Sequence, residues 1–276
     1  MKYLAAVDLS EASLLALDAL RALAQDEPGD VTLLHVVDLD LYTAGGSVPG
    51  IMEFALERLT QEAERLAGCG LSAPTIRVEQ GDSAQTILRV AAEEQADLIV
   101  MTNLGKGART GRLFGSTAER VASSGTVPVL IERVGVPEQT GENCCRLVAG
   151  SPFERMLVAV DLADDPAGPL AFTFSLPGVS EMRLVNVVPD ASEVEAARAG
   201  LRALEQSAPK DRVVSSEVLV GPPAASIIDA AETWNATTIT LQPCRHGALH
   251  RAVWGSVARA VALGAGCSIL FVGSED

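Results

Sequence analysis

The chain repeats one pattern twice along its 276 residues. Each half opens on an apolar run that ends in Val-Asp: Tyr3–Ser13 reads YLAAVDLSEAS and Met156–Pro166 reads MLVAVDLADDP. Each half closes on Gly-Ser, a short helical pattern and a further apolar run, at Phe114–Glu132 and at Trp254–Val272. A repeat of this length indicates two domains of the same fold.

The repeat predicts an N-terminal domain over residues 1–134 and a C-terminal domain over residues 155–276. Residues 135–154 contain Gly, Pro and the adjacent Cys144 and Cys145, show no clear periodicity, and are expected to be a linker. The chain has five cysteines, an odd number at irregular spacing, which does not predict a disulfide framework.

Apolar runs alternate with helical patterns in both halves. In the first half the expected strands are Tyr3–Val7, Val31–Val37, Ile76–Glu79, Leu98–Thr102 and Val127–Glu132. The first helix expected between them starts near Ser10 and runs to Ala24. The other helices are expected over Ile51–Ala67, Ser83–Glu94 and Ser116–Ser124, and a loop is expected over Tyr42–Gly50. Such alternation predicts α/β domains, each a doubly wound, mostly parallel five-stranded sheet of the Rossmann-like or flavodoxin-like kind.

Composition excludes several classes of protein. A hydrophobic content of 48% excludes a disordered chain, and no apolar run is long enough to span a bilayer. The net charge of −15 and the pI near 4.6 argue against nucleic acid as a partner. Because the chain opens directly on a strand-like run, no signal peptide is expected and the predicted location is the cytoplasm.

The segment after the fourth expected strand carries the clearest chemical pattern. Ligands of doubly wound sheets bind at the carboxyl ends of the strands, where the strand order reverses. Between Thr102 and Thr117 this segment holds four glycines, at 105, 107, 111 and 115, and three basic residues, Lys106, Arg109 and Arg112. Glycines allow close approach of backbone N–H groups to an anion, and the helix that starts at Gly115-Ser116 adds its positive end. The pattern indicates a phosphate cradle, and the alternative is a flexible surface loop with solvated charges.

With these residues the chain resembles the universal stress protein family in its tandem two-domain form. In ATP-binding members the loop reads Gly, two residues, Gly, nine residues, Gly-Ser/Thr. This chain matches the second glycine at Gly105, the nine residues at Lys106–Phe114 and the final pair at Gly115-Ser116. It departs from the pattern at the first glycine, where it has Thr102. The resemblance implies that Asp8 binds the adenosine part, that backbone near Val7 and Val36 holds the adenine, and that the glycine loop holds the phosphates. The ATP-binding residues implied in this way are Val7, Asp8, Val36, Met101, Thr102, Gly105, Gly115, Ser116 and Thr117.

The second copy keeps Asp161 and Gly255-Ser256 but has Gln242 and Arg245 at the two loop glycines, so its nucleotide site is expected to be degenerate. Its loop also contains a cysteine and two histidines, Cys244, His246 and His250, which could supply three zinc ligands. No fourth ligand is apparent and neighbouring arginines oppose a cation, so no metal site is predicted.

No catalytic constellation is visible in the sequence. His35 lies in an apolar run and is expected to be a hydrogen-bonded core histidine, and the loop is not the GxxxxGK[ST] form. The first hypothesis is therefore a stress-response protein that binds ATP, with or without Mg²⁺, for regulation rather than catalysis. The alternatives are a slow ATPase and an interaction module that binds no nucleotide. By resemblance, Val127–Glu132 and Ser268–Val272 would join the two halves as a pseudo-dimer, and two chains could form a homodimer.

Overall fold

The computed structural model of the chain divides into two compact units, Met1–Leu147 and Val148–Asp276. The residues that the structure describes are 1–26, 29–38, 48–67, 73–103, 114–124, 127–135, 146–147, 152–242 and 255–273.

The N-terminal unit is built on five parallel strands. They are β1 (Lys2–Ala6), β2 (Asp30–Val37), β3 (Thr75–Gln80), β4 (Leu98–Thr102) and β5 (Val129–Glu132). Their order is β3-β2-β1-β4-β5, and every neighbouring pair is parallel. This is the Rossmann order without its sixth strand, and it differs from the flavodoxin order, in which the third strand lies beside the first. The predicted doubly wound α/β sheet is confirmed, in its Rossmann-like form.

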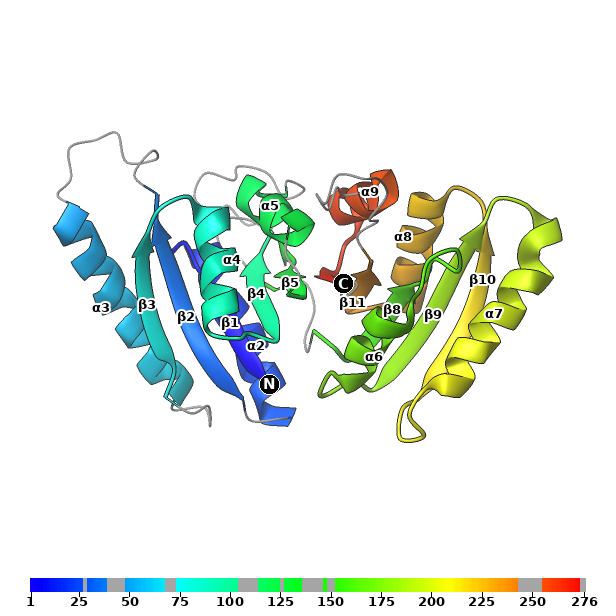
Figure 1. The fold of residues 1–276 in the computed structure, drawn as a ribbon, viewed down its shortest axis with the longest axis horizontal. Helices are drawn as coiled ribbons and strands as arrows, with labels where there is room; N and C mark the ends of the chain where they lie inside the picture. The colour runs from blue at the N-terminus through cyan, green and yellow to red at the C-terminus, as the bar shows by residue number, and fades with distance from the viewer. Residues whose placement is uncertain are drawn as a thin grey trace. The chain divides into compact units, whose positions relative to one another are not determined.

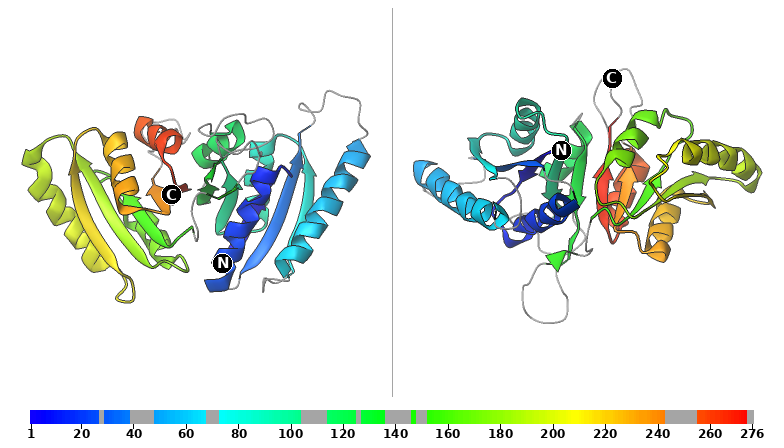
Figure 2. Two further views of the ribbon diagram at one scale, coloured as in Figure 1. Left: turned by 180° about the vertical axis from the view of Figure 1, so that it is seen from behind. Right: turned by 90° about the horizontal axis from the view of Figure 1, so that it is seen from below.

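Helices cover both faces of this sheet. They are α1 (Glu11–Leu14), α2 (Ala16–Asp26), α3 (Val48–Ala67), α4 (Ser83–Glu93) and α5 (Ser116–Ser124). Figure 1 shows α4 and α5 in front of the sheet, and the view from behind in Figure 2 shows α2 and α3 on the other face. Because both faces are covered, β1 and β4 are continuous apolar runs, and the side chains of Tyr3, Leu4, Leu98 and Ile99 are almost fully buried.

The C-terminal unit has the same topology. Its main strands are β8 (Arg155–Ala159), β9 (Glu181–Val188), β10 (Val214–Val220), β11 (Thr238–Leu241) and β12 (Ser268–Phe271). They are parallel and ordered β10-β9-β8-β11-β12. Its helices are α6 (Ala167–Ser175), the 3₁₀ turn η2 (Ala191–Glu193), α7 (Val194–Ser207), α8 (Pro223–Trp234) and α9 (Ser256–Gly264). Figures 1 and 2 show α6 and α7 on one face of this sheet and α8 and α9 on the other.

At the end of the N-terminal unit, β6 (Val134–Gly135) and β7 (Arg146–Leu147) form a short antiparallel pair, all of which except Val134 lies in the segment expected to be a linker. In the C-terminal unit, Trp234 ends α8 and is 8% exposed. The guanidinium carbons of Arg155 and Arg183 lie 4.8 and 4.7 Å from the centroid of its ring, within range of a cation–π contact.

No helix within the described ranges is long and apolar enough to cross a membrane.

Two helix boundaries differ from the sequence expectation. The single helix expected between Ser10 and Ala24 is two helices, α1 and α2, because Leu15 N–H bonds to the oxygen of Ala12 and Asp18 N–H to that of Leu15, three residues back. Helix α3 starts at Val48, inside the expected loop, since proline at position 49 is tolerated in a first turn.

Candidate functional site

The carboxyl ends of β1, β2 and β4 meet at one edge of the N-terminal sheet. β1 lies between β2 and β4, with Ala6 opposite Leu34 and Ala5 opposite Val100. From β1 the chain winds first toward β2 and β3 and later toward β4 and β5, so the gap beside β1 is the topological switch point. The predicted residues Val7, Asp8, Val36, Met101 and Thr102 all belong to the ends of these three strands.

Asp8 is held by the turn that follows β1. Its Oδ1 accepts hydrogen bonds from the N–H of Ser10 at 2.9 Å and from the hydroxyl of Ser10 at 2.5 Å. Its own N–H donates to Ser13 Oγ at 3.2 Å. Leu9, in the middle of this turn, has φ of +63°, a left-handed conformation that side chains other than glycine adopt at a cost. The half-buried Asp8 carboxylate therefore has a fixed orientation at the end of β1.

Val7, directly before Asp8, is hydrogen-bonded to residues of β2 through both its N–H and its carbonyl oxygen. Its N–H donates to Leu34 O at 2.9 Å, and its carbonyl oxygen accepts from His35 Nδ1 at 2.8 Å. Since a carbonyl only accepts, this imidazole carries hydrogen on Nδ1. His35 is 3% exposed, which confirms the predicted hydrogen-bonded core histidine.

Asn103, the residue after β4, connects this strand to α5. Its N–H donates to Glu132 O at 3.1 Å, and its side-chain Oδ1 accepts from Val134 N–H at 2.9 Å. Its carbonyl oxygen accepts from Gly115 N–H at 3.1 Å, which places the start of α5 against the end of β4. Met101 and Thr102 are both 6% exposed, so the threonine that replaces the family's first glycine is packed into the protein.

The first turn of α5 presents unsatisfied donors at this edge. The first bond of the helix runs from Glu119 N–H to Gly115 O at 3.0 Å. Within the described part of the chain, the N–H groups of Ser116, Thr117 and Ala118 have no acceptor. Among the described residues, a β-carbon added at Gly115 would meet only Asn103 O, at 3.6 Å, which is an ordinary contact, so these residues do not require glycine there. Free N–H groups at the positive end of a nine-residue helix can bind an anion.

Several predicted residues lie outside the described ranges. They are Gly105, Lys106, Arg109 and Arg112 of the glycine loop, and Cys244, His246 and His250 of the second loop. Among the residues that are described, no group of three or more His, Cys, Asp or Glu side chains is placed to hold a metal ion. Cys267, directly before β12, is buried in the core of the C-terminal unit.

The C-terminal unit keeps the framework of this edge. Asp161 Oδ1 accepts from Ala163 N–H at 2.9 Å, as Asp8 does from Ser10. Asn186 stands at the position of His35 and donates through Nδ2 to Val160 O at 2.9 Å. Gly255 O accepts from Arg259 N–H at 3.1 Å, as Gly115 O does from Glu119. These shared contacts belong to the fold, so they do not by themselves distinguish a binding unit from one that has lost its ligand.

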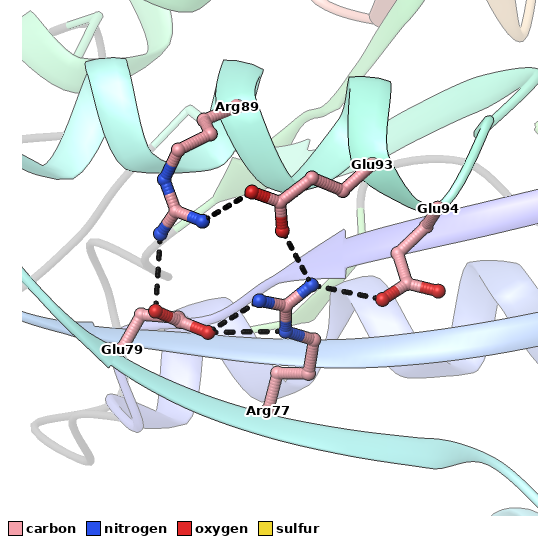
Figure 3. A network of polar contacts seen from close by, with 5 residues as sticks. All are labelled: Arg77, Glu79, Arg89, Glu93 and Glu94. Atoms are coloured by element: carbon pink, nitrogen blue, oxygen red, sulfur yellow. Dashed lines mark hydrogen bonds and ion pairs between the residues drawn. The ribbon is translucent and has the colours of Figure 1, made fainter.

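Charged side chains of β3 and α4 form the network in Figure 3. Arg77 binds Glu79, Glu93 and Glu94 at 2.5, 2.9 and 2.9 Å, and Arg89 binds Glu79 and Glu93 at 3.0 and 2.6 Å. The hydrogen bond from Arg77, helped by Arg89, holds the pKa of Glu79 below its usual range. The network fastens the middle and end of α4 to the edge strand β3, whereas the candidate site lies at the ends of β1, β2 and β4 and at the start of α5. The beginning of α4, which follows β3, is the part of this helix at the same edge of the sheet.

A second ion pair, which the sequence did not predict, lies at that beginning. Arg120 of α5 makes two hydrogen bonds to Asp82, with Nη1 at 2.7 Å from Oδ2 and Nη2 at 2.8 Å from Oδ1. These bonds and that of Gln85 N–H hold the pKa of Asp82 below its usual range. The sequence carries one signal for this pair: both residues are missing from the second copy, which has Pro222 at the position of Asp82 and Ala260 at the position of Arg120.

The chain was compared with known proteins. The model of the universal stress protein family matches residues 1–133 and 152–273. Universal stress protein YxiE of Bacillus subtilis is 31% identical over 147 residues, which are 48% of this chain and 98% of that protein. A universal stress protein of Thermus aquaticus is 36% identical over 86 residues, 29% of this chain and 63% of its own.

Among solved structures, a universal stress protein from Archaeoglobus fulgidus aligns over 100% of this chain and 97% of its own, with a TM-score of 0.74 and 24% identity. A protein from Pseudomonas aeruginosa described as a putative universal stress protein aligns over 99% and 92%, with a TM-score of 0.68 and 18% identity. At these identities the structures establish the fold of both units. With the two matches of the family model, they show that the chain belongs to the universal stress protein family, as a tandem of two of its domains.

Proposed function

We propose that the N-terminal unit binds an adenine nucleotide, ATP, and that binding regulates a conformation or a partner instead of driving a reaction. The observation that carries this proposal is the first turn of α5. Its three N–H groups without acceptors among the described residues stand against the end of β4, beside the switch point of the sheet. Phosphate oxygens are the natural acceptors for such a turn.

In this proposal the residues keep the roles that the sequence implied. Asp8 contacts the ribose, and the backbone of Val7 and Val36 contacts the adenine. The phosphates lie between the loop that contains Gly105 and the start of α5 at Gly115, Ser116 and Thr117. Met101 and Thr102 support the site from the end of β4. A Mg²⁺ ion could accompany the phosphates with ligands from phosphate and water.

A regulatory role is supported by the surroundings of the only histidine in the first half, His35. Its Nδ1 is engaged with Val7 O and its side chain is buried, so it is poorly placed to act as a base on a bound phosphate. The test of this part is phosphate release from ATP by the purified protein. Release that disappears in Asp8→Ala would replace the regulatory proposal with a slow ATPase.

The matched experiment on binding uses the two corresponding helix starts. Gly115→Ala adds a β-carbon that makes only an ordinary contact with Asn103 O among the described residues, so the protein should tolerate it, whereas it would crowd a phosphate bound at this turn. Gly255→Ala is the corresponding change at the start of α9 in the C-terminal unit. Titration calorimetry with ATP, with and without Mg²⁺, and native mass spectrometry give affinity and stoichiometry. We expect one nucleotide per chain, at least about tenfold weaker binding in Gly115→Ala because a phosphate hydrogen bond is lost, and no change in Gly255→Ala.

Other outcomes would change the proposal in defined ways. Two nucleotides per chain, reduced to one in Gly255→Ala, would show that the C-terminal site is intact. No bound nucleotide and no heat with ATP would favour an interaction module in which neither unit binds nucleotide. The same mass spectra would test the predicted homodimer, while the pseudo-dimer through Val127–Glu132 and Ser268–Val272 stays a prediction.

A further inference from the structure

The ion pair between Asp82 and Arg120 joins the beginnings of two helices. Both guanidinium Nη atoms bond to the carboxylate, and Asp82 Oδ1 also accepts from Gln85 N–H at 2.9 Å, which caps α4. One carboxylate therefore holds the first turn of α4 and the second turn of α5. A bidentate pair of this kind fixes direction as well as distance.

Arg120 acts on the part of α5 that carries the candidate phosphate donors. It lies four residues after Ser116, which is one helical turn, and its side chain reaches Asp82, the N-cap residue of α4. The start of the helix is fixed to β4 by the bond from Gly115 to Asn103 O. With that end fixed, the Asp82–Arg120 pair adds a directional contact between the second turn of α5 and the start of α4.

Asp38 adds a second carboxylate to this arrangement. It follows β2, and its attraction for Arg120, together with the stronger contact from Asp82, raises the pKa of the guanidinium above its ordinary value. Arg120 is thus attracted by carboxylates that follow two neighbouring strands, mainly by Asp82 after β3 and less by Asp38 after β2.

The fold itself does not need these three residues. The C-terminal unit has the same strand order, and its α8 packs on α9 as α4 packs on α5. Gly81 and Gly221 make the same turn, with φ of +147° and +139° and N–H bonds to Val37 O and Val188 O. Within this common frame, the positions of Asp38, Asp82 and Arg120 are occupied by Pro189, Pro222 and Ala260.

All three charged residues are thus missing from the unit whose glycine loop has also been lost. Exposed ion pairs contribute little to stability, so stability alone is a weak reason for keeping this one in the N-terminal unit. We infer, on the basis of the nucleotide site proposed above, that Arg120 is a positioning residue. Held by Asp82, it fixes α5 so that the N–H groups of Ser116 and Thr117 converge on the phosphates of the nucleotide.

The test is a double-mutant cycle on ligand affinity. Asp82→Asn removes the charge but keeps a good helix cap, and Arg120→Gln removes the other partner. Titration calorimetry with ATP and with adenosine, which lacks phosphate, is carried out on both single variants and on the double variant. We expect ATP to bind roughly fivefold more weakly in each single variant, and about equally weakly in the double variant, because the two residues act as a unit. The affinity for adenosine should not change.

The control is Arg89→Gln. Arg89 is as exposed as Arg120, with side-chain exposures of 47% and 48%, and it also pairs with carboxylates, but it lies away from the beginning of α4. It should leave the affinity for both ligands unchanged. Circular dichroism on each variant establishes that it is folded before the titrations are compared.

Three results would overturn the inference, and they differ from failure of the nucleotide proposal itself. If the native protein binds ATP and both single variants bind it equally well, Arg120 does not position the helix. Equal loss of ATP and adenosine would mean that the pair only supports the fold. Multiplied losses in the double variant would mean that the two residues act separately. If the native protein binds neither ligand, the proposed function fails first.

Discussion

The contact between His35 and Val7 O allows a quantitative prediction about the strand that precedes Asp8. His35→Leu keeps an apolar side chain of similar volume but removes the donor that lies 2.8 Å from a carbonyl oxygen of a residue only 4% exposed. The carbonyl then stays buried without that partner, which costs about 1–3 kcal/mol. Because leucine fills the space of the ring, little is added for a cavity, and we expect a loss of about 2 kcal/mol in the free energy of unfolding.

The chain supplies its own conservative variant. Asn186 makes the equivalent bond to Val160 O at 2.9 Å, so an asparagine can serve as the donor at this position of the fold. His35→Asn should therefore keep the bond and lose only the packing of the ring, at a cost of about 1 kcal/mol. Although asparagine is smaller and more polar than leucine, it should be the better tolerated of the two.

Urea unfolding followed by circular dichroism gives the free energies, and hydrogen–deuterium exchange gives their location. In His35→Leu, amides of residues 3–9 should exchange faster, whereas the corresponding change Asn186→Leu should affect residues 155–161. The reasoning is refuted if His35→Leu is as stable as the native protein, or if His35→Asn is the less stable of the two variants.

The remaining predictions concern acid and the turn after β3. Arg77 holds the pKa of Glu79 below its unfolded value, so this pair stabilises the protein above about pH 4.5. The stabilisation is lost as the pH falls through the folded pKa of Glu79. Arg77→Gln should therefore make the urea midpoint depend less on pH on the acid side. Gly81→Ala should lower the free energy of unfolding by about 1–3 kcal/mol, because φ is +147° and the new β-carbon would lie 3.0 Å from Thr86 Oγ1. Gly221→Ala should cost a similar amount, and equal urea midpoints for either variant and the native protein would contradict this.

The architecture could be predicted because its cause is local in the sequence. A strand covered on both faces, such as β1 or β4, is a continuous apolar run, and the helices between such runs enforce parallel pairing. The repeat then gave each element a second occurrence. The break between α1 and α2 at Leu15 could not be predicted from periodicity, because the sequence has neither glycine nor proline there. Whether a backbone N–H bonds to the carbonyl three or four residues back depends at this point on packing.

The local structure of the candidate site was predictable where it depends on backbone and not where it depends on distant side chains. The helix start at Gly115-Ser116 was predicted because a glycine before a helix is a pattern along the chain, and the structure confirms this start and places it against β4, while its binding of phosphate stays a prediction. The burial of His35 was predicted, but its partner Val7 is 28 residues away, and no spacing rule connects them. Arg120 and Asp82 are 38 residues apart, and only comparison of the two copies distinguishes them from other surface charges.

Both tryptophans of the chain, Trp234 and Trp254, belong to the C-terminal half, and the proposed nucleotide site belongs to the N-terminal half. The tryptophan fluorescence of the protein, excited at a wavelength that tyrosine does not absorb, therefore originates in one unit, where the Trp234 ring lies beside the guanidinium groups of Arg155 and Arg183. A change in emission when ATP is added would then be a signal transmitted from one half of the molecule to the other. The unlabelled chain thus carries its own optical reporter for communication between its domains.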